Sequence, residues 1–325
     1  MVINIFLRYS KYDMKYNEAR ILFMGTPQIS AYVLNRMIQY GFNVVALVSQ
    51  PDRPVGRKHI IMPTPTKEVA LKYNIPVYQP ERIRKDYEFI KEINPDLIIT
   101  LAYGQILPEG LLAIPRFGCL NLHGSILPKY RGAAPIQYAL INNEQYTGMS
   151  LMEMTKDMDA GRVYRTQSIE IHEEDNASSL YEKLAKVAYY LVEECIPLYL
   201  NKKLEGFPQD ESKVTFAPTI KKEEEHLDLT KDKENIYGYI RALSDAPGAY
   251  FNSELGKIKV FKAKIISDEI KGEVGEIVKA DKEGIYLQAT NGLLSLIELQ
   301  KEGKSRMDYR NFLNGNQYFL HTKLS

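Results

Sequence analysis

Cysteine is scarce in this chain, which has two cysteines among 325 residues. Cys119 and Cys195 lie far apart, and no metal-ligand spacing surrounds either of them. Cys119 also falls inside an apolar run, where a cysteine behaves as a small hydrophobic side chain. A disulfide framework and a zinc site are therefore not expected, and we expect a cytoplasmic protein that holds no metal.

Long apolar runs and an excess of one charge are missing too. No uninterrupted apolar stretch approaches the roughly 20 residues of a membrane span, and Val2–Leu7 is too short for a secretory signal. The formal net charge is +1, so any contact with nucleic acid would need a local basic patch. With 45% hydrophobic residues, the chain can form the cores of one large domain and one smaller domain.

A strand, a helix and a second strand open the patterned part of the chain. Arg20–Gly25 and Val44–Val48 are apolar runs, and a helical pattern lies between Pro27 and Gly41. Continuous apolar strands predict a mostly parallel sheet covered on both faces, so we expect a Rossmann-like α/β domain. The turn Gly25-Thr26-Pro27 lacks the Gly-x-Gly-x-x-Gly spacing, which argues against binding of a nicotinamide dinucleotide.

Asn121 and His123 interrupt the apolar run that begins at Phe117. Residues two apart on a strand share a face, so both side chains should point the same way at the strand's end. An amide donor beside an imidazole can stabilise negative charge on a carbonyl oxygen while a proton moves nearby, which is the chemistry of acyl transfer. The alternative is a polar pair that only satisfies its own hydrogen bonds.

A turn rich in glycine and proline follows, Gly124-Ser-Ile-Leu-Pro-Lys-Tyr-Arg-Gly-Ala-Ala-Pro135. Such a turn fixes an irregular backbone that can present main-chain donors and acceptors to a ligand. The string from Asn121 to Pro135 resembles the signature of the folate-dependent formyltransferases, in the long form of those that act on methionyl initiator tRNA. The resemblance extends from Arg20 to Gly315, so it covers nearly the whole chain.

The resemblance implies that Asn121, His123 and Asp159 are the catalytic residues. Asp159 stands in Met-Asp-Ala-Gly, where the family has Leu-Asp-Thr-Gly. By composition alone, this segment is a turn whose acids would be solvated or would hold local hydrogen bonds. Three neighbours of Asp159 depart from the family pattern, and a second carboxylate among them could alter its environment. They are Asp157, Ala160 and Arg162.

The implied formyl donor is 10-formyltetrahydrofolate, and two loops are implied to bind it. One follows the apolar strand Leu97–Ala102, and the other follows His123. In open α/β sheets, ligands bind beyond the carboxyl ends of the strands, so both loops should face one crevice. Each residue could equally belong to an ordinary turn. The residues implied to bind the folate are Tyr103, Gly104, Gln105, Ile106, Leu107, Ser125, Ile126, Leu127 and Pro128.

The segment 49–65 is studded with proline and carries clustered basic residues. Proline disfavours regular structure, so we expect an exposed loop, either simply solvated or able to grip phosphate. Gln-Pro-Asp-Arg-Pro-x-Gly-Arg resembles the family's loop for the acceptor end of initiator tRNA, which implies tRNA binding by Arg53, Arg57 and Lys58. His59-Ile60-Ile61 stands where further basic residues are typical.

The predicted domains are a tail over 1–19, a formyltransferase domain over 20–203, a linker over 204–225 and a C-terminal domain over 226–325. Met1 or Met14 could be the natural start. Within the second of these segments, a helix is expected from Ser178 to Leu200, with Ser179 and Glu182 forming a capping box.

The C-terminal segment shows short strands separated by Gly, Asp and Lys, which predict a small antiparallel β-barrel of the OB type. Near its end, Lys301, Lys304 and Arg306 lie close together. The resemblance implies that they bind tRNA. Without the resemblance, a solvated run of charges would be the better interpretation.

The sequence thus predicts transfer of a formyl group from 10-formyltetrahydrofolate to the α-amine of methionyl initiator tRNA, for translation initiation. Two alternatives stay open: a formyltransferase acting on a small amine, and an RNA-binding protein without catalysis. We expect a monomer with no membrane or DNA partner.

Overall fold

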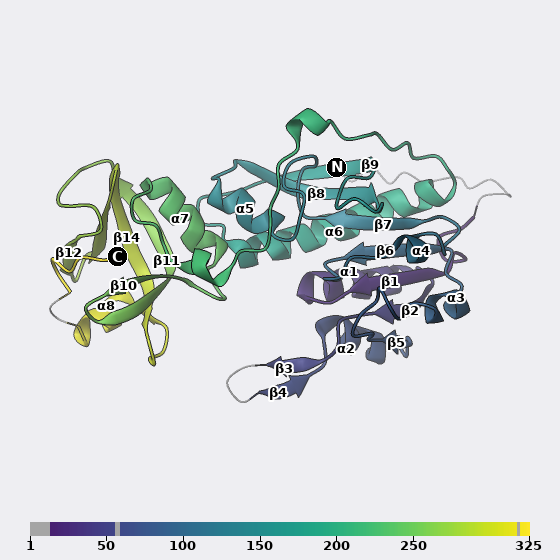
Figure 1. Cartoon of the computed structure of the whole chain (residues 1–325), viewed down its shortest axis with the longest axis horizontal. Helices are drawn as coiled ribbons and strands as arrows, with labels where there is room; N and C mark the ends of the chain where they lie inside the picture. Colours follow the sequence, from purple (N-terminus) through teal and green to yellow (C-terminus); the bar gives the residue numbers. More distant parts are fainter. Residues whose placement is uncertain (1–13, 56–58, 317–318) are drawn as a thin grey trace. The chain divides into compact units, whose positions relative to one another are not determined.

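The computed structural model describes residues 14–55, 59–316 and 319–325 (Figure 1). The described chain divides into two compact units that interleave along the sequence. Unit 1 takes the chain through Arg131 together with Gly148–Ser168 and Glu182–Thr215. Unit 2 combines Gly132–Thr147, Ile169–Tyr181 and Phe216–Ser325.

The main sheet has the strand order β5-β2-β1-β6-β7-β8-β9, and Figure 1 shows the strands side by side in this order. The strands from β5 to β7 run parallel, and β8 is antiparallel to β7. Every residue of β1 and β6 is buried, as continuous apolar runs predict. The predicted Rossmann-like, mostly parallel sheet is confirmed. The strand bounds are β1 Ile21–Gly25, β2 Val44–Val48, β5 Val77–Tyr78, β6 Leu97–Leu101, β7 Cys119–His123, β8 Tyr146–Glu153 and β9 Val163–Glu170.

Local signals fix the ends of the helices that accompany this sheet. After α1, Gly41 adopts the left-handed conformation (φ 100°), and its N–H bonds the carbonyls of Met37 and Ile38. Before α2, the Thr64 side chain accepts the N–H of Lys67. These helices are α1 Gln28–Tyr40, α2 Pro65–Lys72, α3 Phe89–Ile93, α4 Glu109–Leu112 and α6 Ala177–Leu200.

The capping box predicted at Ser179 and Glu182 was wrong. Asn176 lies just before α6, and its Oδ1 accepts the backbone N–H of Ser179 at 3.0 Å. Ser179 Oγ in turn accepts the N–H of Asn176 at 3.1 Å. The reciprocal cap therefore forms three residues earlier, because asparagine also accepts a backbone N–H from this position.

The segment 49–65 forms a hairpin rather than an irregular loop. Strand β3 (Arg53–Val55) pairs antiparallel with β4 (Ile60–Met62), and Pro54 stands opposite Ile61. Both strands of a two-stranded ribbon are edges, and proline is tolerated on an edge strand because its missing N–H can face outward. Ile60, Ile61 and Met62 are all exposed.

Unit 2 contains an antiparallel sheet of order β10-β11-β14-β13-β12, with β15 paired to β14. Strand β11 is long and continues through register shifts against β14. The bounds are β10 Ala249–Ser253, β11 Gly256–Ser267, β12 Ile277–Asp281, β13 Gly284–Ala289, β14 Gly292–Lys301 and β15 Met307–Asp308. The helices of this unit are α5 Pro135–Ile141, α7 Lys233–Ala242 and α8 Tyr309–Asn314.

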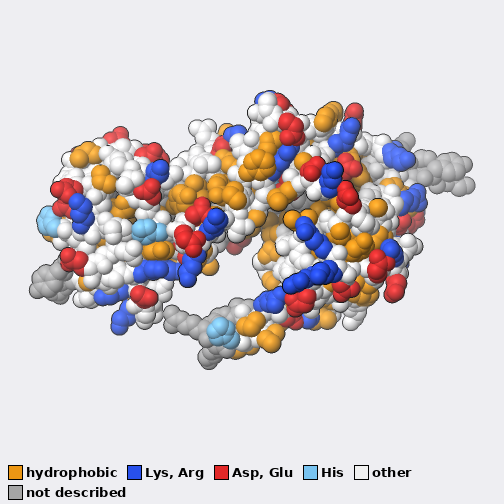
Figure 2. Space-filling view, in the orientation of Figure 1, with side chains coloured by type: hydrophobic (Ala, Val, Ile, Leu, Met, Phe, Trp, Pro, Cys, Tyr) orange, Lys and Arg blue, Asp and Glu red, His pale blue; other side chains and the backbone are white. Residues whose placement is uncertain are grey.

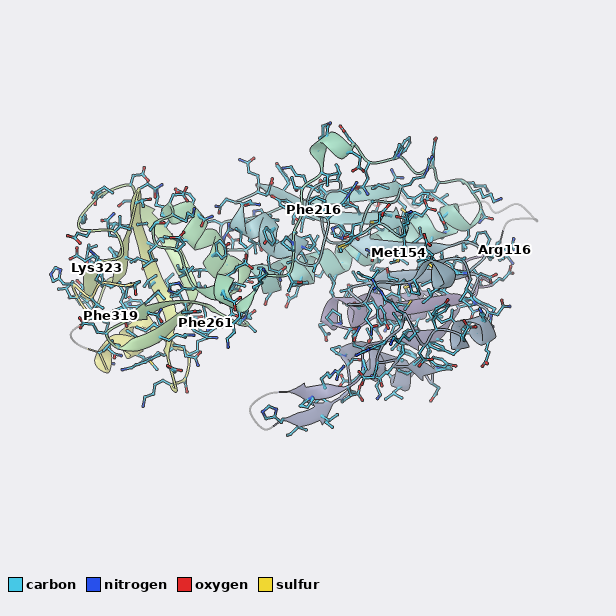
Figure 3. All side chains as sticks on the ribbon, in the orientation of Figure 1. Arg116, Met154, Phe216, Phe261, Phe319 and Lys323 are labelled. Carbon is cyan, nitrogen blue, oxygen red and sulfur yellow. The ribbon has the colours of Figure 1, made fainter. Side chains whose placement is uncertain are left out.

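Aromatic and helix contacts form the core of unit 2. Phe319, labelled in Figure 3, meets Phe312 of α8 edge to face, with ring centroids 5.1 Å apart. Helix α7 packs closely on α5 because Gly238 has no side chain. A Cβ there would lie 2.6 Å from the Leu140 carbonyl oxygen. Two short 3-10 helices lie between α6 and α7 in the sequence. They are Glu211–Lys213 in unit 1 and Lys222–Glu225 in unit 2.

Candidate active site

Strand β7 carries Asn121 and His123 on one face of the main sheet, in unit 1. Asn121 stands beside Thr100 of β6 in the parallel register. The Thr100 hydroxyl donates to Asn121 Oδ1 at 2.7 Å and also lies 3.2 Å from the sulfur of Met154, which Figure 3 labels. Because this bond engages the amide oxygen, the Nδ2 group is the end of Asn121 that remains for a ligand.

The imidazole of His123 is 5% exposed and is held at both nitrogens. Nε2 lies 2.8 Å from the Tyr130 carbonyl oxygen, and Nδ1 lies 3.5 Å from Asp159 Oδ2. A carbonyl oxygen only accepts, so Nε2 carries a proton. In the neutral ring, Nδ1 is then the basic nitrogen, and it faces the carboxylate of Asp159.

Asp159 lies in the turn between β8 and β9, with its side chain 14% exposed. Its backbone is left-handed (φ 51°), a conformation that non-glycine residues adopt at some cost. Gly161 allows the turn to close onto β8, because a Cβ there would lie 2.0 Å from the Glu153 carbonyl oxygen. The structure therefore brings His123 and Asp159 together from distant parts of the sequence, beside Asn121.

The loops after β6 and β7 lie at the same edge of the sheet, since these strands are parallel neighbours. Ser150 of β8 fixes the second loop: its hydroxyl donates to the Ser125 carbonyl at 2.7 Å and accepts the Leu127 N–H at 3.3 Å. Of the residues implied to bind folate, several are buried and the others are partly or fully exposed. The buried ones are Tyr103, Leu107, Ser125 and Leu127, and the accessible ones are Gly104, Gln105, Ile106, Ile126 and Pro128.

Tyr103 carries a buried polar atom without a partner. Its hydroxyl has no hydrogen bond among the described residues, although the side chain is 4% exposed. Burial also raises the pKa of this phenol, so the hydroxyl keeps its proton. A buried donor without an acceptor is costly, and it marks a place where a ligand atom would be favourable.

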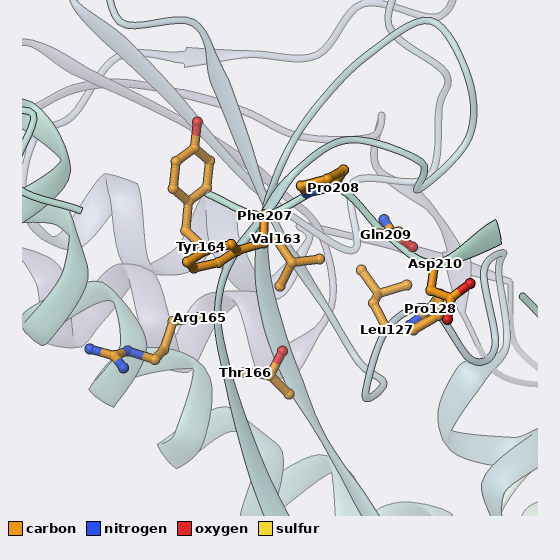
Figure 4. A pocket seen from close by; sticks show the side chains of 10 residues that line it. All are labelled: Leu127, Pro128, Val163, Tyr164, Arg165, Thr166, Phe207, Pro208, Gln209 and Asp210. Carbon is orange, nitrogen blue, oxygen red and sulfur yellow. The ribbon is translucent and has the colours of Figure 1, made fainter. Parts of the chain in front are cut away.

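A pocket of about 320 Å³, shown in Figure 4, lies in unit 1 between β9 and the loop that follows His123. Ser150 stands opposite His123 in the β7–β8 register, and its hydroxyl lies 2.9 Å from that of Thr166 on β9. Cross-strand neighbours share a face, so these three side chains form a row that leads to the pocket. Its walls are Leu127, Pro128, Val163, Tyr164, Arg165, Thr166, Phe207, Pro208, Gln209 and Asp210.

The basic residues implied to bind tRNA differ in their surroundings. In the hairpin, Arg53 is exposed and pairs with Glu81 at 2.9 Å, whereas Arg57 and Lys58 lie outside the described residues. In unit 2, Lys304 is exposed and Lys301 is partly exposed.

Arg306 differs from these lysines because, within the described part of the chain, its side chain is the one of the three with carboxylate and aromatic partners. Its guanidinium lies 4.4 Å from the centre of the Phe261 ring, 3.4 Å from Asp245 and in contact with Glu298. The two carboxylates therefore already balance the positive charge of the Arg306 guanidinium.

Sequence reasoning missed the residues that hold the catalytic candidates in place. Gln209 donates to the carbonyl oxygens of Asp159 and Gly161 at 2.7 and 2.9 Å. Thr215 accepts the Tyr130 N–H at its hydroxyl, at 2.9 Å. Both residues lie in a polar segment without periodicity, and they act on backbone groups, so no sequence pattern marks them.

Cys119 lies two residues before Asn121, but burial raises the pKa of its thiol to about 12. It therefore stays a protonated core side chain, as expected. Over the described ranges, no three His, Cys, Asp or Glu residues are arranged to share a metal ion. None of the helices in the described part of the chain combines the length and the apolar character needed to cross a bilayer.

Two family models match the chain. One is described as formyl transferase and matches residues 19–196, and the other is described as formyl transferase, C-terminal domain, and matches residues 219–317. Proteins named methionyl-tRNA formyltransferase are similar over nearly the whole length. The one from Bacillus mycoides (strain KBAB4) is 42% identical over 308 residues, which make up 94% of this chain and 98% of the relative. The one from Bacillus thuringiensis subsp. konkukian (strain 97-27) is 41% identical with the same coverage.

Solved structures share the fold at lower identity. A variant of HypX from Aquifex aeolicus superposes with a TM-score of 0.64 at 18% identity, covering 93% of this chain and 49% of HypX. The sugar 3N-formyl transferase WlaRD also gives a TM-score of 0.64 at 18% identity, covering 88% of this chain and 99% of WlaRD. At these identities the likeness concerns the fold alone.

Proposed function

Because the chain belongs to the formyl transferase family, we propose that it transfers the formyl group of 10-formyltetrahydrofolate to the α-amine of methionyl initiator tRNA. The observation that carries this proposal is the 42% identity to a methionyl-tRNA formyltransferase over 94% of this chain and 98% of the relative. A match of that extent includes both the segment with Asn121, His123 and Asp159 and the C-terminal segment.

The side chains present at the site suit the formyl donor. When bound, 10-formyltetrahydrofolate supplies an activated formyl carbon attached to its N10 atom. Leu127 and Pro128 offer apolar walls, and the unpartnered Tyr103 hydroxyl offers a buried hydrogen bond. Asn121 Nδ2 remains to donate to the formyl oxygen, because Thr100 already engages Oδ1.

In the proposed mechanism, the methionine amine attacks the formyl carbon while Asn121 donates to the oxygen that becomes negative. The attacking nitrogen loses a proton to the pair formed by Asp159 and His123, whose Nδ1 lies 3.5 Å from the carboxylate. The pair then donates that proton to N10 as the carbon–N10 bond breaks, so both side chains return to their starting state.

The acceptor end of the tRNA is assigned to the β3–β4 hairpin, through Arg53, Arg57 and Lys58, and to Lys301 and Lys304 in unit 2. Basic side chains attract the phosphate backbone without reading its sequence. Arg306 belongs to the same predicted set, but its contacts with Glu298 and Asp245 weaken the case for it.

A formyltransferase acting on a small amine is the nearest rival, because sugar formyltransferases share the fold. It would use the same Asn121, His123 and Asp159, but it would leave the exposed hairpin without a purpose. An RNA-binding protein without catalysis would leave the His123–Asp159 pair unexplained.

Incubation of the protein with 10-formyltetrahydrofolate and charged initiator tRNA tests the proposal, with formyl-methionine as the product measured. Free methionine and amino sugars serve as competing acceptors in parallel reactions. We expect formylation of the charged tRNA alone. Transfer to a small amine instead, or tRNA binding without turnover, would replace this function with one of the two rivals.

The proposal also takes the chain to act as a monomer in the cytoplasm, where translation begins. Sedimentation of the purified protein tests the first point.

A further inference from the structure

The side chain of Gln209 makes hydrogen bonds at both ends of its amide. Its Oε1 accepts from Nε and Nη2 of Arg131, at 3.1 and 3.0 Å. Its Nε2 donates to the backbone carbonyl oxygens of Asp159 and Gly161, at 2.7 and 2.9 Å. A primary amide offers two acceptor positions and two donor hydrogens, so the side chain of Gln209 is fully satisfied.

The partners of Gln209 fix which end of the amide points where. A guanidinium only donates and a carbonyl only accepts, so the oxygen must face Arg131 and the nitrogen must face the turn. Arg131 is 4% exposed, and the Glu211 carboxylate holds it through bonds of 2.7 and 3.2 Å. Arg131, which is buried and ion-paired, therefore orients the amide of Gln209 so that its nitrogen faces the turn.

One of the two carbonyls that Gln209 holds belongs to Asp159 itself, and the other belongs to Gly161, two residues later in the same turn. Asp159 adopts a left-handed backbone (φ 51°), which persists only where its surroundings enforce it. With the turn fixed, the Asp159 carboxylate lies 3.5 Å from His123 Nδ1. Gln209 itself bonds the backbone of the turn and not the imidazole.

We propose that Gln209 is a positioning residue: it holds the turn of Asp159 so that the carboxylate faces His123. This inference rests on the proposed function, because it assigns Gln209 to the support of that reaction. Gln209 lies in the segment 204–225, which was predicted to be a linker, so this segment would form part of the active site's framework.

Gln209→Glu tests the proposal with little change in volume. The carboxylate can still pair with Arg131, but it replaces the donor group with an oxygen that repels two carbonyls. A displacement of about 1 Å in such a site can cost roughly 100-fold in rate, so we expect kcat to fall about 10- to 100-fold. The KM for tRNA should change by less than about twofold, because the side chain of Gln209 bonds the backbone of the turn.

Two further variants accompany this measurement. Gln167→Glu is the matched control, since it makes the same chemical change on the exposed face of β9 and should leave kcat unchanged. Gln209→Asn is one methylene shorter and cannot reach Arg131 and the turn together, so it should lose kcat as well. It provides the kinetic test should Gln209→Glu not fold. Normal kcat in both Gln209 variants overturns the proposal.

A double-mutant cycle separates positioning from general support of the fold. If Gln209 acts through Asp159, Gln209→Glu should cost less than about twofold when Asp159 is already Asn. A full additional loss in that background would mean that Gln209 acts elsewhere, and it would overturn the proposal.

Amide hydrogen exchange gives a readout that needs no activity. Exchange over residues 157–161 should be faster in Gln209→Glu than in the wild type and unchanged in Gln167→Glu. Should the wild-type protein fail to formylate charged tRNA, the proposed function would fall while this measurement still decided whether Gln209 holds the turn. Equal exchange in all three proteins would overturn the positioning role.

Discussion

At the scale of single residues, the site depends on which nitrogen of His123 holds the proton. The Tyr130 carbonyl accepts a hydrogen bond from Nε2–H, so the basic Nδ1 is directed toward Asp159. We expect His123→Ala to lower kcat by about 10² to 10⁴, because it removes one half of the pair that transfers the proton. Single-turnover formylation of charged tRNA measures the effect on the chemical step.

The control for this variant is His172→Ala, which removes an exposed imidazole in unit 2. It should leave the rate unchanged. A His123→Ala protein with near-normal turnover would remove this imidazole from the mechanism.

Gly161 is the second residue on which the site depends. A methyl group at this position would approach the Glu153 carbonyl oxygen to 2.0 Å, and a backbone atom of β8 cannot move aside easily. We expect Gly161→Ala to lower the free energy of unfolding by about 1–3 kcal/mol, the usual cost of overpacking, and to reduce kcat by displacing Asp159. Chemical denaturation and steady-state kinetics measure the two effects.

Gly315→Ala serves as the comparison, because its Cβ would meet nothing closer than 3.9 Å. Equal stability of Gly161→Ala and the wild type would mean that the turn and β8 can separate without cost.

Sequence reasoning proposed Asn121, His123 and Asp159 because motifs mark them, and the structure places these three side chains in one unit. It missed Gln209, Thr215 and the hydrogen bond from His123 to the Tyr130 carbonyl. These contacts join side chains to backbone carbonyls or N–H groups, so they depend on the path of the chain in space. Neither residue type nor spacing encodes that path.

At the scale of secondary structure, the hairpin shows how an element is anchored at its base. Lys67 of α2 lies 2.5 Å from Asp52 and 2.8 Å from Gln79, and Gln79 also donates to Asp52 at 2.7 Å. Burial raises the pKa of Asp52, but the hydrogen bonds from Gln79 and Lys67 and the charge of Lys67 outweigh it and lower the pKa overall. The folded state therefore favours the carboxylate, and this stabilisation is present above the ordinary Asp pKa of about 3.9 and lost as the pH falls below it.

Lys67→Met removes this anchor at neutral pH. If the hairpin engages the tRNA, the KM for tRNA should rise several-fold while folate binding stays unchanged, since the hairpin would no longer be held in one position. Steady-state kinetics with each substrate varied in turn measures this. Lys72→Met, an exposed change on the same helix, should have no effect. A KM that stays constant in Lys67→Met would show that the base of the hairpin does not matter for binding.

The strands of the main sheet were predictable because buried parallel strands are continuous apolar runs. The hairpin was not, since its residues are polar or exposed and a proline lies within it. In unit 2, β11 carries several charged residues, so its length is not marked by an apolar run, and its backbone continues through a change of register against β14. The cap of α6 was misplaced because Asn176 and Ser179 offer equivalent signals one turn apart.

At the scale of the whole molecule, charge is balanced rather than concentrated. The net charge is +1, and on the face shown in Figure 2 blue and red side chains are interspersed. A protein of this kind is not drawn to nucleic acid by an overall field. Affinity for tRNA must then depend on a few basic side chains whose charge is not already used.

Lys301 and Lys304 differ from Arg306 in this respect, and the difference gives a testable contrast. If both lysines contact phosphate, changing both to Ala should reduce the slope of log affinity against log salt by about two, with kcat unchanged at saturating tRNA. Arg306→Ala should instead lower the melting temperature, because Arg306 pairs with Asp245 and Glu298 and lies over Phe261, and it should leave the salt slope nearly constant. Salt titrations of tRNA binding and thermal melts measure both. The contrary result is a salt slope that Arg306→Ala reduces as much as the lysine changes do. That result would mean that tRNA displaces Asp245 and Glu298 from Arg306, and that pairing within the protein does not decide which cations bind RNA.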